Sequence, residues 1–135
     1  MAPSPAMNAK ASALVDDAAV IWLTTVSAEG RPQASPVWFV VDSGEFLVFS
    51  LADTPRTTNI ASNPRVSLNL DSNEGSDVVV VEGLARVVDG PSSADHSAYQ
   101  AKYRDRIVGM GYTPDEFAAA YPTPIRIIPL RWRVY

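Results

Sequence analysis

The stretch "AVIWLTTVSAEGRPQASPVWFVVDSGEFLVFSL", residues 19–51, contains three runs that are typical of β-strands. Residues 19–26 are apolar and β-branched, and a turn around Gly30 separates them from a second run at 32–41. A short polar connection then leads to a third apolar run at 46–51. The pattern predicts three consecutive strands joined by tight turns.

Two prolines and two aromatic residues mark the second run. Pro32 and Pro36 cannot donate ladder hydrogen bonds, so this run is expected at a sheet edge or at a bulge. Trp38 and Phe39 are adjacent, and on a strand they face opposite sides. One is expected in the core and the other at a groove or a partner chain, unless both pack between layers.

The remaining sequence mixes strands with short helices. Strand patterns occupy 65–71, 77–90 with Gly83 as a bulge or bend, and 123–135 as one or two strands. Helical signals occur at 54–62, within 93–110 and at 114–121. The second helix carries Tyr99, Tyr103 and Ile107 at helical spacing, and the third begins with Thr113-Pro114-Asp115-Glu116, a capping pattern.

This order predicts one domain at residues 13–135, after a loose tail at 1–12 that is rich in Pro, Ala and Ser. The elements follow one another too closely for long βαβ crossovers. We therefore expect a mainly β fold, an antiparallel barrel with peripheral helices, and exclude a doubly wound parallel sheet.

Composition narrows the function classes. The 135 residues include no cysteine, which excludes disulfides and thiolate metal sites. Their formal charge of −4 argues against nucleic-acid binding by bulk attraction. No apolar run approaches the roughly 20 residues of a membrane span, and no secretory signal opens the chain, so a cytoplasmic location is expected. Arg126, Arg131 and Arg133 lie in the last ten residues, with no acid after Glu116, so this end could hold an anionic small molecule.

The sequence offers little for ordinary catalysis. His96 is the only histidine and lies at a helix start, where a surface role is the usual one. Ser35 and Ser50 lack a histidine partner, and the acids in 71–77 do not have calcium-loop spacing. We assign no catalytic residue and no metal site, and expect a cofactor to carry the reaction if the protein is an enzyme.

The segment "TPRTTNIASNPRVSLNL", 54–70, leaves two interpretations open. Thr54 and Pro55 are suited to the first positions of a helix. Arg56 is followed by two threonines and an asparagine, which together with free helix N–H groups could bind a phosphate. The alternative is a capped surface helix with one solvated arginine.

In order and spacing, five segments resemble the pyridoxamine 5′-phosphate oxidase-like split β-barrel family, and most closely its coenzyme F420-dependent oxidoreductase branch, over residues 14–135. The segments are "IWLTTVSAEGRPQASPVWFVVDSGEFLVFS", "TPRTTNIASNPRVSLNL", "VEGLARVV", "YQAKYRDRI" and "PIRIIPLRWRVY". The resemblance implies a six-stranded antiparallel Greek-key split barrel with peripheral helices. It also implies a homodimer with two cofactors at the subunit interface.

The resemblance also implies a set of cofactor-binding residues. Many members have a lysine two or three positions before Asn-Leu or Asn-Ile, and Arg56 takes that place here. The implied phosphate site consists of Arg56, Thr57, Thr58 and Asn59. The implied ring site consists of Pro36, Val37 and Trp38 along the cofactor ring, with Ser50 and Leu51 beneath ring and phosphate. The partner subunit is implied to contribute Arg131 and Trp132.

The function implied is an F420-dependent reductase that transfers a hydride to a small, unsaturated or quinone-like substrate. Two alternatives remain: an FMN-dependent enzyme of the oxidase type, and a cofactor-binding carrier without turnover. Neither nucleic acid nor a membrane is expected as a partner.

Overall fold

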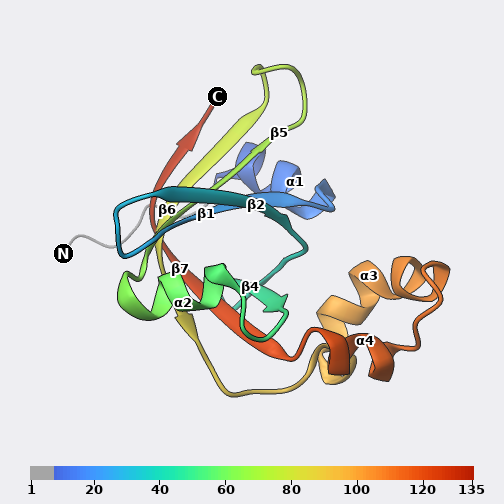
Figure 1. Cartoon of the computed structure of the whole chain (residues 1–135). Coiled ribbons are helices and arrows are strands. Elements are labelled where there is room, and N and C mark those ends of the chain that lie inside the picture. The colour runs from blue at the N-terminus through green and yellow to red at the C-terminus, as the bar shows by residue number, and fades with distance from the viewer. Residues whose placement is uncertain (1–7) are drawn as a thin grey trace.

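The computed structural model describes residues 8–135, which form a strongly curled β-sheet with helices at its margins (Figure 1). The strands are β1 (Ile21–Val26), β2 (Pro32–Val37), β3 (Val40–Asp42), β4 (Glu45–Ser50), β5 (Arg65–Asp71), β6 (Val78–Val87) and β7 (Thr123–Val134). The helices are α1 (Ala9–Asp17), α2 (Pro55–Ser62), α3 (Ser97–Gly109) and α4 (Pro114–Ala120), with a 3-10 turn, η1 (Ser93–Asp95).

All neighbouring strands pair antiparallel, in the order β2-β1-β5-β6-β7-β4-β3. The curled antiparallel sheet confirms the predicted mainly β split-barrel class. It has seven strands rather than six, because the run predicted as one strand at 32–41 is interrupted at Trp38 and Phe39. Strand β2, with Pro32 and Pro36, is an edge strand, as the prolines predicted.

Glycines and a bulge fix the turns of the sheet. Ser43 and Gly44 connect β3 to β4 with φ angles of 53° and 76°, the backbone that a tight hairpin requires. The pairing of β6 with β7 shifts register between Glu82 and Gly83. A Cβ at Gly83 would lie 2.7 Å from the carbonyl oxygen of Ile128, so the predicted bulge is confirmed and only glycine fits there.

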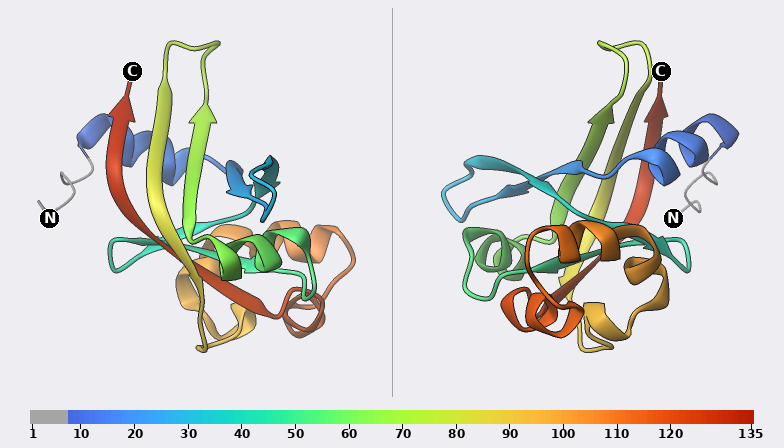
Figure 2. Two further views of the ribbon diagram at one scale, coloured as in Figure 1. Left: turned by 60° about the vertical axis from the view of Figure 1, so that its left-hand side comes forward. Right: turned by 90° about the vertical axis from the view of Figure 1, so that its right-hand side faces the viewer.

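Two apolar clusters hold the elements together. The first fills the inside of the curled sheet and includes Phe39, Phe46 and Ile125. The second lies between the β3–β4 hairpin and helices α3 and α4, which Figures 1 and 2 show together at one end of the sheet. Phe39 belongs to the first cluster, whereas the neighbouring Trp38 packs against the second. The two adjacent rings therefore face opposite sides, as their alternation predicted, and each packs with a different cluster.

Helix α1 corrects the predicted tail. Asn8 caps its first turn by accepting a hydrogen bond from the Ala11 backbone N–H, at 2.8 Å. Ala11 and Val15, one helical turn apart, are fully buried in the first cluster. The prediction of a loose tail is therefore wrong for residues 9–12, while residues 1–7 lie outside the described residues.

The helix starts predicted from capping residues are correct. Thr54 accepts from Thr57 N–H at the start of α2, and Thr113 and Glu116 form a reciprocal capping box at the start of α4.

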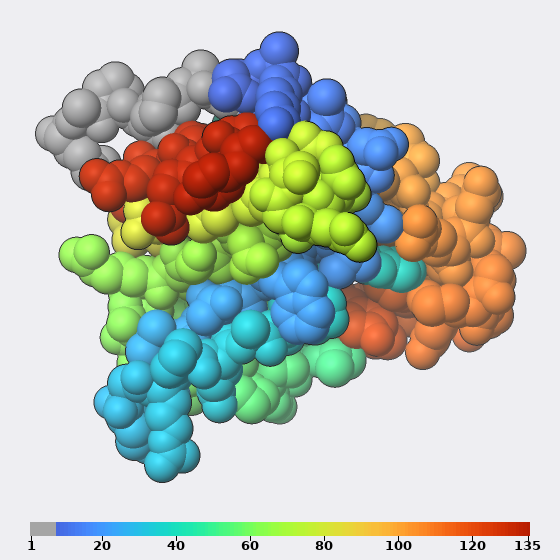
Figure 3. All heavy atoms as spheres, turned by 90° about the horizontal axis from the view of Figure 1, so that it is seen from above, coloured from blue at the N-terminus to red at the C-terminus, as the bar shows by residue number. Residues whose placement is uncertain are grey.

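Over the described residues, each helix falls short of the length and apolar character needed to cross a bilayer. The space-filling view shows α3 (orange) on the opposite side of the molecule from the tip of the β1–β2 hairpin (Figure 3).

Candidate functional site

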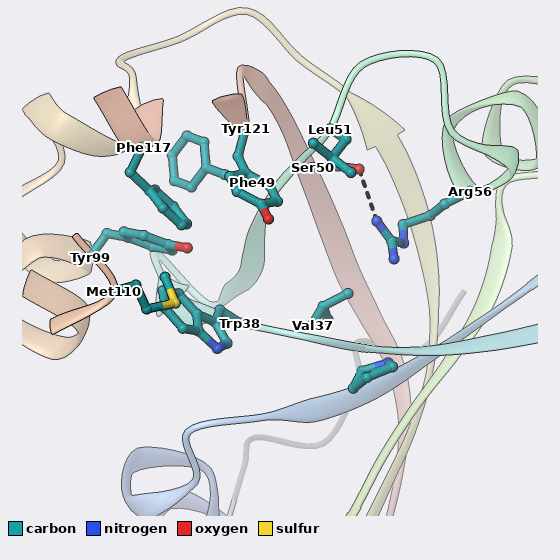
Figure 4. Close-up of a pocket in the computed structure, with 11 residues that line it drawn as sticks. Val37, Trp38, Phe49, Ser50, Leu51, Arg56, Tyr99, Met110, Phe117 and Tyr121 are labelled. Carbon is teal, nitrogen blue, oxygen red and sulfur yellow. Dashed lines mark hydrogen bonds between the residues drawn. The ribbon is translucent and has the colours of Figure 1, made fainter. Parts of the chain in front are cut away.

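A pocket of about 300 Å³ opens where the ends of β2 and β4 meet α2, α3 and α4 (Figure 4). One end of it is polar, with Arg56 and Ser50, and the other is aromatic, with Tyr99 and Phe117. The pocket is lined by Pro36, Val37, Trp38, Phe49, Ser50, Leu51, Arg56, Tyr99, Met110, Phe117 and Tyr121. Among the described residues of this lining, Arg56 is the only one with a charged side chain.

Two serines hold the Arg56 guanidinium. Nη1 donates to Ser50 Oγ at 2.9 Å, and Nη2 donates to Ser35 Oγ at 2.7 Å. The Nε–H is buried and has no partner within residues 8–135. The ion pairs of this part of the chain do not include Arg56 either. The guanidinium is thus held in place by neutral groups, with its charge uncompensated.

Burial lowers the pKa of the Arg56 guanidinium from its usual value, because a charge in this position has lost part of its water. Arginine nevertheless stays protonated in proteins. A half-buried cation without a carboxylate partner is costly, and an anion bound beside it would offset that cost. The local electrostatics therefore fit an anionic ligand at the polar end of the pocket.

The residues after Arg56 serve the helix rather than the pocket wall. Thr57 Oγ1 donates back to the Thr54 carbonyl at 2.9 Å, and Thr58 is exposed. Asn59 is buried and donates to Thr25 Oγ1 at 2.9 Å and to Gln33 Oε1 at 2.6 Å. These bonds fasten α2 to β1 and β2, and so fix the position of Arg56.

A second pocket, of about 280 Å³, lies beside Arg56 and is lined mainly by small and polar residues. It shares Arg56 with the first pocket, and its lining consists of Thr25, Gln33, Ala34, Ser35, Thr54, Pro55 and Arg56. Arg56 thus lines both the first pocket, which has an aromatic end, and the second pocket, which is polar.

Tyr103 sets the position of Trp38 at the aromatic end. The two rings stack with centroids 4.7 Å apart and planes within 1° of parallel. The Tyr103 hydroxyl accepts from Phe39 N–H at 2.8 Å and lies 2.8 Å from the Ala19 carbonyl, to which it donates. Phe117 stacks on Trp38, at 5.4 Å. The interruption between β2 and β3 is therefore clamped with Trp38 facing the pocket.

The pocket gathers six of the eleven residues singled out from the sequence: Pro36, Val37, Trp38, Ser50, Leu51 and Arg56. Thr57, Thr58 and Asn59 flank it, on α2. Arg131 and Trp132 lie elsewhere: Arg131 is exposed beside Glu82, and Trp132 packs near Phe46. For both, the role in a partner's site remains a prediction.

Sequence reasoning did not assign the other five residues of the pocket lining. These are Phe49, Tyr99, Met110, Phe117 and Tyr121. The helical spacing of Tyr99 and Tyr103 indicated a buried face, but not what that face covers. His96 is the N-cap of α3, where Nδ1 accepts from Tyr99 N–H at 3.2 Å, so it has a helix-end position as expected.

The curled antiparallel sheet, with a cationic and aromatic pocket at its edge, defines a protein of the split β-barrel class. Residues 7–133 match the profile of the pyridoxamine 5′-phosphate oxidase family, and the chain belongs to this family.

Solved structures of similar fold include proteins with different names. A conserved hypothetical protein from Mycobacterium tuberculosis is 22% identical, with a TM-score of 0.77 over 99% of this chain and 89% of that one. An F420 reductase is 25% identical, with a TM-score of 0.70 over 90% and 94%. The heme storage protein HutZ from Vibrio cholerae is 18% identical, with a TM-score of 0.68 over 95% and 94%.

Proposed function

We propose that this chain binds the phosphate of coenzyme F420 at Arg56 and acts as a reductase of a small unsaturated or quinone-like substrate. One observation carries the proposal: the half-buried Arg56 guanidinium is held by two serine hydroxyls and lacks a carboxylate partner among residues 8–135. Arginine presents a planar fork of donors that matches phosphate oxygens.

The lining residues fit such a cofactor. Arg56 and Ser50 would hold the phosphate, and the strand end with Pro36, Val37 and Trp38 would lie along the ring. A bound deazaflavin supplies hydride-transfer chemistry. The chain itself fixes the ring orientation through the clamped Trp38, and the aromatic residues of α3 and α4 exclude water from the ring face.

Two observations favour F420 over FMN. The F420 reductase is 25% identical and aligns over most of both chains. In addition, the polar second pocket continues beyond Arg56, through Gln33 and Thr54. The phosphate of F420 carries a further glutamyl tail, whereas the phosphate of FMN is terminal. A space beyond the phosphate anchor is therefore useful for F420 alone.

The proposed active form is a homodimer. The outer face of the sheet carries Trp22 and Ile128, 46% and 38% exposed, beside a groove lined by Arg65, Arg131 and Arg133. Exposed large apolar side chains next to positive charge are suited to a second copy that brings an anionic cofactor. Light scattering of the purified protein tests this assembly, and a monomer with full cofactor affinity would contradict it.

The test of the proposed function is a titration of the purified protein with F420 and, separately, FMN, followed by tryptophan fluorescence. We expect tight binding of F420. Arg56→Gln should weaken it by about 1.5–3 kcal/mol, roughly 10- to 150-fold, because a charge-assisted phosphate contact is lost. Arg126→Gln is the matched control, since Arg126 lies outside the pocket lining and should leave affinity unchanged.

Tight FMN binding without F420 binding would overturn the choice of cofactor, and unchanged affinity in Arg56→Gln would overturn the phosphate site. Turnover is a separate question. A reductase oxidises the reduced cofactor faster with a quinone acceptor than the same mixture does without protein, whereas a carrier gives equal rates.

A further inference from the structure

The aromatic end of the pocket contains two tyrosine hydroxyls, those of Tyr99 on α3 and Tyr121 at the end of α4. Figure 4 shows both oxygens within the pocket, remote from the Arg56 end. Neither hydroxyl has a hydrogen-bond partner in the part of the chain that the structure describes, and the hydrogen bond that Tyr99 makes to a side chain there comes from its backbone N–H, which donates to His96 Nδ1.

Tyr99 is buried as a residue, but its hydroxyl is not among the fully enclosed polar atoms without a partner, so the oxygen keeps access to the pocket. Its side chain is 1% exposed, and buried tyrosine hydroxyls normally find a partner. Tyr103, the neighbour one turn along α3, follows that rule, because its hydroxyl bonds to the backbone of Phe39 and Ala19. Tyr99 instead directs its hydroxyl into the pocket, where only a ligand or water can satisfy it.

The two hydroxyls are suited to donate. Burial raises the pKa of Tyr99, so this phenol stays protonated at neutral pH. As far as residues 8–135 show, the pocket lining includes no carboxylate that could accept from either tyrosine. Trp38, Phe117 and Tyr121 stack on one another, with centroids 5.4 and 4.6 Å apart, and give this end of the pocket an aromatic wall. Such a wall is suited to contact with a conjugated ligand, which would bring the acceptor with it.

We propose that Tyr99 and Tyr121 form a donor pair that binds a carbonyl oxygen of a flat, conjugated ring compound at the aromatic end of the pocket. Two ligands could present this carbonyl: the substrate, or the cofactor through its own ring carbonyls. The second source rests on the proposed function, while the chemistry of the pair does not.

The experiment compares 1,4-naphthoquinone with naphthalene, which has the same ring frame without carbonyls. Binding to the full chain is followed by the chemical shifts of the tryptophan indole N–H protons. Without cofactor, we expect the quinone to bind at least about tenfold more tightly than naphthalene, since two hydrogen bonds distinguish the ligands. The chain has no cysteine, so the quinone has no thiol to arylate.

The double variant Tyr99→Phe/Tyr121→Phe keeps both rings and removes both hydroxyls. It should bind naphthalene as the wild type does and lose the tenfold preference for the quinone. Tyr112→Phe is the matched control, because Tyr112 is partly exposed and outside the pocket lining. Thermal unfolding of all variants checks that the fold is retained.

The same double variant is then titrated with F420 and FMN. A lost quinone preference with unchanged cofactor affinity assigns the pair to the substrate, and a fall in cofactor affinity of fivefold or more assigns it to the cofactor ring. The proposal is overturned if quinone preference and cofactor affinity both stay the same, or if quinone and naphthalene weaken equally. A wild type that binds neither cofactor contradicts the proposed function only.

Discussion

Two half-buried arginines of this molecule differ in their partners. Arg126, on β7, donates to Asp42 Oδ2 at 2.6 Å and to Glu45 Oε1 at 3.3 Å. Within residues 8–135, Arg56, on α2, donates only to Ser50 and Ser35. The carboxylates raise the pKa of Arg126, whereas burial lowers that of Arg56. One guanidinium is therefore neutralised within the fold, and the other is available to an external anion.

Under the proposed function, this contrast separates a binding role from a stabilising role in two residues of the same type. Arg126 ties the β3–β4 hairpin to β7, and its ion pairs close that corner of the sheet. Arg56 is positioned just as firmly, but by neutral hydroxyls that compete only weakly with a phosphate. The serines orient the fork without neutralising it.

The largest expected effect is on F420 affinity, and it comes from a substitution that places a carboxylate beside Arg56, as Asp42 and Glu45 lie beside Arg126. Ser35→Asp places a carboxylate beside Nη2, which would both pair with the guanidinium and repel a phosphate. We expect F420 affinity to fall by at least about 1.5–3 kcal/mol, and the ligand-free protein to gain up to about 1 kcal/mol in its free energy of unfolding. Fluorescence titration and urea unfolding measure the two changes.

Ser35→Asn is the control for the size of the new side chain. It should cost much less affinity than Ser35→Asp, since it adds no charge. Equal losses in the two variants would show that the serine position matters through its shape, and that the missing carboxylate at Arg56 does not explain binding.

An intermediate effect is expected on stability. Arg126→Gln should lower the free energy of unfolding of the ligand-free protein by about 1 kcal/mol, because partly exposed ion pairs contribute little each. Arg56→Gln should leave it unchanged or raise it, since an uncompensated charge disappears. Urea unfolding of both variants measures the two free energies of unfolding. A larger decrease for Arg56→Gln than for Arg126→Gln would reverse the roles assigned to the two arginines.

Local signals in the sequence predicted much of the fold and one end of the site. Thr54 and Pro55 begin α2 as expected, which places Arg56 in its first turn at the pocket. Turn glycines and alternating residues likewise predicted the strands, because such signals act over a few residues. Helix α1 was missed, since a segment rich in Pro, Ala and Ser looks like a tail until Ala11 and Val15 are seen to pack against the sheet.

The aromatic end of the site depends on contacts between distant parts of the chain. Phe49, Tyr99 and Phe117 come from three elements that meet only after α3 and α4 fold back onto the β3–β4 hairpin. Helical spacing indicated that Tyr99 is buried, but no pattern within α3 shows that its hydroxyl lacks a partner. That feature, like the absence of a carboxylate near Arg56, follows from the assembled packing.

The smallest expected effect concerns pH. Hydrogen bonding to Arg126 holds the pKa of Asp42 below its usual 3.8, with His96 a lesser contributor. A carboxyl with a depressed folded-state pKa stabilises the protein above the unfolded value and loses that contribution as pH falls through the folded value. The free energy of unfolding should therefore drop as pH falls from about 5 to below 3.8, by less than about 1 kcal/mol for this group.

Urea unfolding between pH 3 and pH 7 isolates this contribution by comparing variants. Asp42→Asn and Arg126→Gln should both flatten the acid slope relative to wild type. Arg56→Gln should keep the wild-type slope, because Arg56 pairs with no carboxylate within residues 8–135. Asp71, whose pKa is also lowered, by backbone N–H groups of Gly75 and Asn73, contributes equally to all curves and cancels in the differences. A flattened slope in Arg56→Gln would mean that Arg56 holds a carboxylate in solution, which would remove the distinction between the two arginines.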